Sequence, residues 1–190
     1  MSTDDWPTPQ WLVDQLAAEF GPFDLDPAAS AANTKASAYY TRDDDGLAQE
    51  WKGRVWLNSP YGRELVPWLA KARAEVAAGR AEIVVCLVPV RTGTKWWLAA
   101  TASAALVRYW PRRIEFGSTD GVPGAPGFDS AIIVYGTLPR RHGTTPAWCT
   151  ACRKVFWPAR DGAKTCGDTC RKARQRSRQT SSKRDIRRAS

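Results

Sequence analysis

Ile83-Val84-Val85-Cys86-Leu87-Val88 is an uninterrupted apolar run that stops at Pro89. A short run of this kind, without polar alternation, is typical of a strand that is buried on both faces. Strands of parallel sheets are buried in this way because helices cover both sides of the sheet. We therefore predict a buried parallel strand over residues 83–88, with Cys86 in the core.

Helical and strand-like patterns alternate on both sides of this run. Apolar spacing and breaker residues predict helices at about 9–20, 65–78 and 95–102, and further strands at 23–26, 55–57, 105–109 and 130–135. A short segment at 113–116 precedes the last strand, which should form a late hairpin. This order predicts a doubly wound α/β domain whose ligands bind at the carboxyl ends of the strands.

The first helix has a defined start in the sequence. Thr8 is expected to cap it, and Pro9 to take its first helical position, where a missing N–H is tolerated. Leu12, Val13, Leu16 and Phe20 then provide an apolar face before Gly21-Pro22 ends the helix.

The charge of the chain is concentrated near its end. The 190 residues carry a net charge of +9. Residues 1–140 hold 14 Lys/Arg against 16 Asp/Glu, which gives −2, and residues 141–190 hold 14 against 3, which gives +11. This asymmetry favours a near-neutral catalytic body with an arm for a polyanion, although a basic tail that is merely solvated would have the same composition.

The chain contains no run of eighteen apolar residues, and its first residues are acidic rather than basic. The sequence therefore shows neither the pattern of a membrane span nor that of a secretory signal. We therefore expect a soluble intracellular protein.

Asn58-Ser59-Pro60-Tyr61 directly follows the strand predicted at 55–57. The side-chain oxygen of Asn58 and the backbone carbonyl of Ser59 could accept hydrogen bonds from an exocyclic amine. Two such acceptors would stabilise the positive charge that grows on the amine nitrogen of adenine while it attacks a methyl donor. The residues alone would also fit an ordinary turn after a strand.

The other two residues of this loop suit the same chemistry. Tyr61 could stack on a base that has left the duplex, because the amine cannot be reached inside a base pair. Pro60 stiffens the loop by fixing φ. No catalytic base is required, since the methylated amine loses a proton to water, and the single histidine, His142, lies in a predicted linker.

Five further segments accompany this loop in a fixed order. They are Trp6-Pro-Thr-Pro, Leu25-Asp-Pro-Ala-Ala-Ser, Asp45-Gly-Leu with Trp51-Lys-Gly-Arg-Val-Trp, Leu87-Val-Pro-Val-Arg-Thr-Gly-Thr-Lys-Trp-Trp, and Arg113-Ile-Glu-Phe with Ser130-Ala-Ile-Ile-Val. In order and spacing the chain resembles the phage-type DNA N6-adenine methyltransferase (Dam) family over about residues 6–136. The resemblance implies a Rossmann-like class I methyltransferase fold, S-adenosylmethionine as donor and double-stranded DNA as substrate. It also implies a gene of phage or prophage origin, with its product in the cytoplasm of a bacterial host cell.

The resemblance also implies where the donor binds. The Thr8-Pro9 segment and the strand end at Asp26-Pro27-Ala28 should lie near it. Asp26 could accept from the ammonium of the donor, and Asp45, in the Asp43–Asp45 run, could bind its ribose. A strand-ending turn and a solvated loop are the plain alternatives for these two sites.

Two positions depart from the family pattern. Ser59 stands where Dam members usually have proline, and Ala28-Ala29-Ser30 replaces the glycine-rich loop of most methyltransferases. We expect the first change to be tolerated, because the implied acceptor is a backbone carbonyl. The second predicts weak donor affinity or help from residues elsewhere in the chain.

Four cysteines near the end have the spacing of a zinc site. Two close pairs are separated by thirteen residues, and the four members are Cys149, Cys152, Cys166 and Cys170. Such spacing predicts four thiolates around a tetrahedral zinc, and independent structural cysteines are the alternative. Five cations follow that could face phosphate from a continuing helix: Arg171, Lys172, Arg174, Arg176 and Arg178.

These patterns predict a methyltransferase domain at 1–138, a linker at 139–147, a zinc module with a basic helix at 148–180, and a basic tail at 181–190. The predicted activity is methyl transfer to adenine N6. Methylation of cytosine N4 would need similar acceptors, and an inactive DNA-binding protein could retain the same fold.

Overall fold

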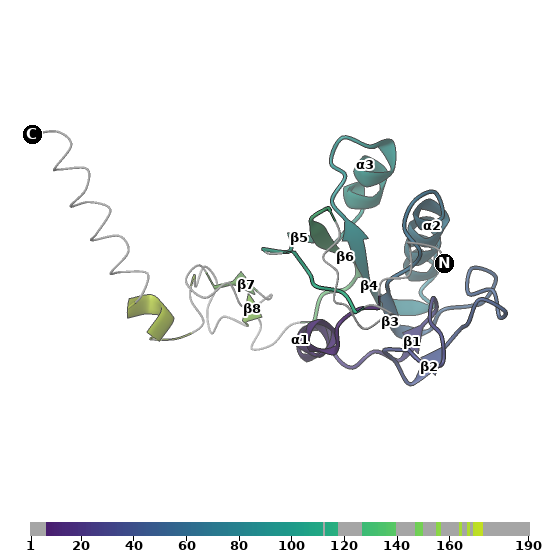
Figure 1. Cartoon of the computed structure of the whole chain (residues 1–190), viewed down its shortest axis with the longest axis horizontal. Helices are drawn as coiled ribbons and strands as arrows, with labels where there is room; N and C mark the ends of the chain where they lie inside the picture. Colours follow the sequence, from purple (N-terminus) through teal and green to yellow (C-terminus); the bar gives the residue numbers. More distant parts are fainter. Residues whose placement is uncertain are drawn as a thin grey trace, which may run out of the picture. The chain divides into compact units, whose positions relative to one another are not determined.

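The computed structural model describes residues 7–111, 113–117, 127–139, 147–149, 155–156, 164, 167 and 169–172. The chain divides into two compact units, Met1–Leu138 and Pro139–Ser190. Figure 1 shows the first unit as helices packed around a central sheet.

A mixed sheet forms the centre of the first unit. Its strands are β1 (Leu25–Asp26), β2 (Ala38–Tyr39), β3 (Gly53–Leu57), β4 (Ala81–Pro89), β5 (Leu106–Tyr109) and β6 (Ser130–Gly136). They lie in the order β2-β1-β3-β4-β6-β5. Strands β2, β1, β3 and β4 run parallel to one another, whereas β6 runs antiparallel to both β4 and β5.

Three helices cover the two faces of this sheet: α1 (Gln10–Phe20), α2 (Leu65–Ala77) and α3 (Lys95–Ala102). Strand β4 divides the core, because successive side chains of a strand point to opposite faces. Val84, Cys86 and Val88 pack in the cluster that includes residues of α2 and α3. Val85 and Leu87 pack with residues of α1, which lies on the other side of the strands in Figure 1.

The predicted α/β class is therefore confirmed, with helices on both faces and a late β5–β6 hairpin. The run at 83–88 is buried as predicted, and Cys86 is in the core. The prediction that this strand, β4, lies in a parallel arrangement is correct only for its pairing with β3. On its other side β4 pairs with β6 in the opposite direction, with Cys86 beside Ile133, because β6 returns directly from β5.

Two predictions about short strands were incomplete. The strand expected at 23–26 is reduced to Leu25–Asp26, and both residues are buried, so it does not alternate. The pair Ala38–Tyr39 was not predicted, because both residues are exposed and the strand has only two residues. It forms because Ala38 N donates to the Asp24 carbonyl at 3.0 Å.

The expected start of the first helix was wrong by one residue. Pro9 is extended, with φ −64° and ψ 138°, and it precedes the first helical residue, Gln10. No side chain caps this helix, so Thr8 does not cap it. The Thr8 hydroxyl instead accepts a hydrogen bond from Asn58, fifty residues away.

A buried ion pair fixes α1 against the sheet. Arg108 on β5 donates to both carboxylate oxygens of Glu19 on α1, and both side chains are buried. Burial raises the pKa of Glu19, and the Arg108 guanidinium opposes that rise. The pair helps to hold the helix that follows Thr8 in one position.

The second unit contains β7 (Ala147–Trp148) and β8 (Val155–Phe156), which pair antiparallel, and helical residues at 169–172. The predicted loop at 117–127 and linker at 139–147 lie largely outside the described residues. Among the residues that are described, no helix is long and apolar enough to cross a membrane.

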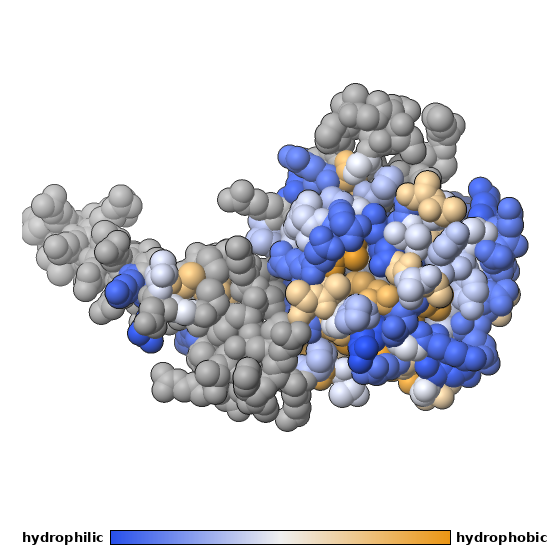
Figure 2. Space-filling model, turned by 90° about the horizontal axis from the view of Figure 1, so that it is seen from below, coloured by the Kyte–Doolittle hydropathy of each residue, from blue (hydrophilic) through white to orange (hydrophobic). Residues whose placement is uncertain are grey.

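The surface of the first unit is mostly hydrophilic on the face that Figure 2 presents, with apolar atoms visible in the middle of that face. Large apolar side chains with substantial exposure include Trp11, Val66, Leu98 and Tyr109.

Candidate active site

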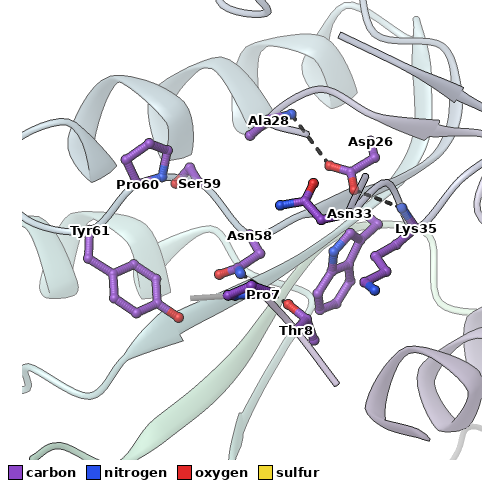
Figure 3. Close-up of a pocket in the computed structure, with 11 residues that line it drawn as sticks. Pro7, Thr8, Asp26, Ala28, Asn33, Lys35, Asn58, Ser59, Pro60 and Tyr61 are labelled. Atoms are coloured by element: carbon purple, nitrogen blue, oxygen red, sulfur yellow. Dashed lines mark hydrogen bonds between the residues drawn. The ribbon is translucent and has the colours of Figure 1, made fainter. Parts of the chain in front are cut away.

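The carboxyl ends of β1 and β3 lie side by side, because these strands are parallel neighbours with Leu25 opposite Val55. Residues that follow the two strands consequently meet at one edge of the sheet. Asp26 and Ala28 come from the end of β1, and the Asn58–Tyr61 loop leaves β3. They line one pocket, shown in Figure 3.

Other segments complete the wall of this pocket. Pro7 and Thr8 reach it from the chain just before α1, and Asn33 and Lys35 reach it from the turns between β1 and β2. Trp56 contributes from β3 itself. The pocket thus collects side chains from four parts of the chain, as expected where parallel strands end.

A hydrogen bond fixes the side chain of Asn58. Its Nδ2 donates to the Thr8 hydroxyl at 3.0 Å. Because the nitrogen of the amide is held on this side, the oxygen lies on the opposite side, toward Tyr61, as Figure 3 shows. The Asn58 oxygen is therefore directed into the same pocket as the aromatic ring.

Ser59 and Tyr61 both carry buried hydroxyl groups. Neither hydroxyl has a hydrogen-bond partner among the described residues. Burial raises the pKa of Tyr61, so the phenol is neutral at physiological pH. Unsatisfied buried polar groups are uncommon in folded proteins, and two of them beside one pocket point to a place where a ligand binds.

The pocket contains a buried carboxylate, that of Asp26. The side chain is 4% exposed. Oδ2 accepts from the backbone N–H of Lys35 at 3.0 Å, and Oδ1 from that of Ala28 at 3.4 Å. Burial raises the pKa of Asp26 to about 6, although both backbone donors oppose the rise. The geometry suits a carboxylate that receives a cationic group of a ligand.

Asn33 and Lys35 were not identified from the sequence. They lie in turns after β1, and no helix forms between residues 27 and 37 of the continuously described stretch 7–111. Lys35 Nζ donates to Gln10 Oε1 at 3.4 Å, and Asn33 Oδ1 accepts from Ser30 N at 2.8 Å. A single lysine in a polar turn gives no sequence signal of a pocket.

Three residues predicted to bind the donor, Pro9, Pro27 and Asp45, do not line the pocket. Asp45 is exposed, with a positive φ of 48°. Its neighbour Gly46 lies against the chain after β1, and an added Cβ there would meet the Pro27 carbonyl at 2.0 Å. Only glycine therefore fits between Asp45 and Leu47.

A buried tryptophan supports this contact from the other side. Trp51 Nε1 donates to the Gly46 carbonyl at 2.7 Å, and Trp51 N donates to Glu75 on α2 at 3.3 Å. Hydrogen bonds from Arg80 are the main cause of the lowered pKa of Glu75, about 2, so this carboxylate stays ionised. The network fixes the Asp45 loop beside the end of β1.

Residues 1–135 match the family model described as DNA N-6-adenine-methyltransferase (Dam). The chain belongs to this family. The match includes every residue of the pocket, from Pro7 to Tyr61. It ends before the second unit begins, so Dam membership concerns the first unit alone.

Two phage proteins are similar to this Dam-family chain. It is 32% identical over 108 residues to the DNA N-6-adenine-methyltransferase of Haemophilus phage HP1 (strain HP1c1), covering 56% of this chain and 61% of the relative. It is 30% identical over 123 residues to the protein of the same description in Escherichia phage T1, covering 64% and 49%. The chain thus spans about half to three fifths of the length of these relatives.

A solved structure was also found for comparison. It is a protein of Pyrococcus horikoshii described as an RNA methyltransferase candidate, with a TM-score of 0.47 and 12% sequence identity. The match covers 72% of the Dam-family chain and 88% of the other chain.

The predicted zinc ligands and DNA-binding residues fall in the second unit. Cys149 is buried directly after β7, and Cys170 is half-buried in the helical stretch that also includes the exposed Arg171 and Lys172. The remaining predicted residues lie outside the described part of the chain: Cys152, Cys166, Arg174, Arg176 and Arg178. Among the described residues, no group of three or more possible metal ligands occurs.

Proposed function

We propose that this protein transfers a methyl group from S-adenosylmethionine to N6 of an adenine that has been extruded from double-stranded DNA. One observation carries the proposal: the Asn58–Tyr61 loop and the buried Asp26 line the same pocket in a chain of the Dam family. The loop suits an amine substrate, and the carboxylate suits a cationic donor.

The residues around Asp26 fit the amino-acid end of the donor. An ammonium group placed there would balance a buried carboxylate that accepts hydrogen bonds from two backbone N–H groups. Thr8 and Ala28 also line this pocket. S-adenosylmethionine, when bound, supplies a methyl group attached to a positively charged sulfur, which makes that methyl group electrophilic.

The Asn58 loop would prepare the adenine amine. The Asn58 oxygen and the Ser59 carbonyl accept the two amine hydrogens, which makes the nitrogen lone pair available and stabilises the positive charge that develops on it. Tyr61 stacks on the base and holds it in place. After transfer, the charged amine releases a proton to water, so no side chain must act as a base.

Product analysis tests this proposal directly. Plasmid DNA incubated with the full chain and isotopically labelled S-adenosylmethionine should yield labelled N6-methyladenine after digestion to nucleosides. Labelled N4-methylcytosine would show instead that the protein methylates N4 of cytosine. DNA binding without any labelled base would identify an inactive member of the family.

The second unit, in this proposal, anchors DNA. A catalytic domain at 1–138 is joined by a linker at 139–147 to a zinc module at 148–180, with a basic tail at 181–190. The spacing of Cys149, Cys152, Cys166 and Cys170 supports a single tetrahedral zinc, and Cys149 follows one strand of a two-stranded hairpin. The metal would supply much of the folding free energy of so small a module.

One zinc per chain is the expected result of elemental analysis on protein purified without added metal. Cys149→Ser and Cys170→Ser should each lower the zinc content well below one, because a tetrahedral site needs all four ligands. Cys86→Ala is the matched control, since Cys86 is buried in β4 of the first unit, and it should retain the metal. Full-length protein without zinc, with its second unit folded, would contradict the assignment.

Removing residues 139–190 should weaken DNA binding sharply while donor binding remains. The donor residues all lie before the cut, in a unit with its own core. Residues 1–138 hold 13 Lys/Arg against 16 Asp/Glu, a net charge of −3, whereas the removed part holds 15 against 3 and so supplies the whole excess of positive charge. Each phosphate contact that is lost should make the plot of log affinity against log salt shallower by about 0.9.

A milder variant of the full chain controls for the truncation. Replacing Arg171 and Lys172 with alanine removes two exposed cations without removing the module, and should reduce the salt slope by up to about 1.8. Equal affinity and equal slope in the truncated and full-length proteins would rule out the anchoring role.

A further inference from the structure

Lys35 brings a positive charge to the pocket that also holds the carboxylate of Asp26. The backbone N–H of Lys35 donates to Asp26 Oδ2 at 3.0 Å. Its side chain extends away from that carboxylate, as Figure 3 shows, and Nζ donates to Gln10 Oε1 at 3.4 Å. Among the residues that the structure describes, no ion pair joins Lys35 to Asp26. The pocket therefore presents two charges of opposite sign that do not neutralise each other.

The contact with Gln10 leaves the Lys35 ammonium weakly held. The side chain of Gln10 is neutral, and the 3.4 Å separation is longer than a typical N–H···O hydrogen bond. Gln10 is also the first residue of α1, a helix that no side chain caps. The start of a helix carries partial positive charge, which disfavours a cation beside it and favours an anion. An anionic group of a ligand would therefore be stabilised by both the lysine and the helix.

The turn that precedes Lys35 fixes the position of its backbone. Thr34 N donates to the Ser30 carbonyl at 3.0 Å, and Asn33 Oδ1 accepts from Ser30 N at 2.8 Å. This turn begins in Ala28-Ala29-Ser30, which replaces the glycine-rich loop of most methyltransferases, so the sequence predicted weak donor affinity or help from other residues. Because the turn is already ordered, a ligand bound by Lys35 would not have to order this segment.

We propose that Lys35 binds the carboxylate at the amino-acid end of S-adenosylmethionine, while Asp26 receives the ammonium of the same end. A zwitterion carries both charges on one carbon atom, and the pocket offers a charge of opposite sign to each. Gln10 is a positioning residue, because its Oε1 holds Nζ beside the pocket. The pocket thus selects adenosine derivatives with a complete amino-acid group. This inference rests on the proposed function, since it concerns the same donor.

Calorimetric titration of the full chain without DNA tests the assignment with two ligands. S-adenosylhomocysteine has both charged groups, and its decarboxylated analogue retains only the ammonium. The parent should bind the analogue about tenfold more weakly, the scale of losing one hydrogen bond between charged groups. Lys35→Met removes the charge and should weaken S-adenosylhomocysteine by a similar factor, while the affinity for the analogue should change less than twofold. Lys35→Arg should recover part of the loss.

Two further variants separate this effect from a change in folding. Gln10→Glu places a carboxylate beside Lys35 Nζ at an exposed position, where it would compete with the ligand. It should weaken S-adenosylhomocysteine more than the analogue, although Lys35 is intact. Lys52→Met is the matched control, because Lys52 is an exposed lysine that pairs with Glu50 and does not line the pocket. It should leave both affinities unchanged.

The inference is wrong if Lys35→Met weakens both ligands equally or neither of them, or if the parent does not distinguish the two ligands. A parent that binds neither S-adenosylmethionine nor S-adenosylhomocysteine would overturn the donor in the proposed function as well. Ligand binding that depends on Lys35 as expected, without any methylated base in DNA, would overturn the proposed transfer alone and leave this inference in place.

Discussion

Replacing Asn58 with alanine is expected to slow methyl transfer to DNA by at least ~100-fold, the scale associated with losing one preorganised transition-state hydrogen bond. The substitution removes the amide oxygen that lies toward Tyr61 and leaves the backbone of the loop in place. Donor affinity should change little, because Asp26 approaches the pocket from a different strand. Single-turnover transfer of a labelled methyl group measures the effect.

Thr8 provides the matched controls for this experiment. Its hydroxyl accepts from Asn58 Nδ2, so Thr8→Ser retains the contact and should retain most of the activity. Thr8→Val has a similar shape but no acceptor, and it should reduce the rate because the amide can then rotate. Parent-like transfer by Asn58→Ala would show that Asn58 does not act on the amine.

Asp26→Asn is expected to weaken S-adenosylmethionine binding by about 10- to 150-fold, since a hydrogen bond to a charged group contributes about 1.5–3 kcal/mol. The substitution keeps the shape of the side chain and removes its charge. Calorimetric titration without DNA measures the loss. An unchanged dissociation constant would exclude Asp26 as the partner of the donor ammonium.

The same carboxylate predicts a pH dependence of donor binding. The pKa of Asp26 is about 6 in the unliganded protein, because burial raises it. A cation binds the ionised form, so affinity should be full above pH 7 and should fall by about tenfold per pH unit below 6. Asp26→Asn should show no such decline between pH 5 and 7, the range in which the ammonium stays charged.

Stability should change in the opposite direction from binding. Because the folded pKa is raised from 3.8 to about 6, the protonated form is favoured by folding. Its stabilising contribution is complete below pH 3.8 and is lost as pH rises through 6. The difference corresponds to roughly 3 kcal/mol as an upper estimate. Asp26→Asn should therefore raise the Tm of the unliganded protein at pH 7, which excludes misfolding as the cause of weak binding.

Much of the fold could be predicted because long elements carry strong periodicity. The helices at 10–20 and 95–102 and the strand at 83–88 repeat apolar residues over enough positions to define their type. Two-residue strands have no such pattern, which explains why β2 was missed. The antiparallel pairing of β4 with β6 also could not be predicted from β4 alone, because a strand buried on both faces looks the same in either arrangement.

The proposed catalytic loop could be recognised because its four residues are consecutive and directly follow a strand. Its neighbours in the pocket are separated from it by up to about fifty residues of chain. Lys35 and Asn33 lie between β1 and β2, in segments whose sequences allow many positions, so only packing could show that they reach the site. The role of Thr8 could not be predicted for the same reason: it was expected to cap a helix, and its hydroxyl instead accepts a hydrogen bond that orients Asn58.

The sequence by itself determined the α/β class, the position of the Asn58–Tyr61 loop directly after a strand and the concentration of positive charge after residue 140, because each depends on residues that are close together in the chain. The tertiary structure alone decided that Asp26 is buried, with a pKa of about 6, and that the rings of Phe128 and Tyr61 are in contact. Burial and ring contacts depend on where distant segments meet, and local composition does not fix that meeting.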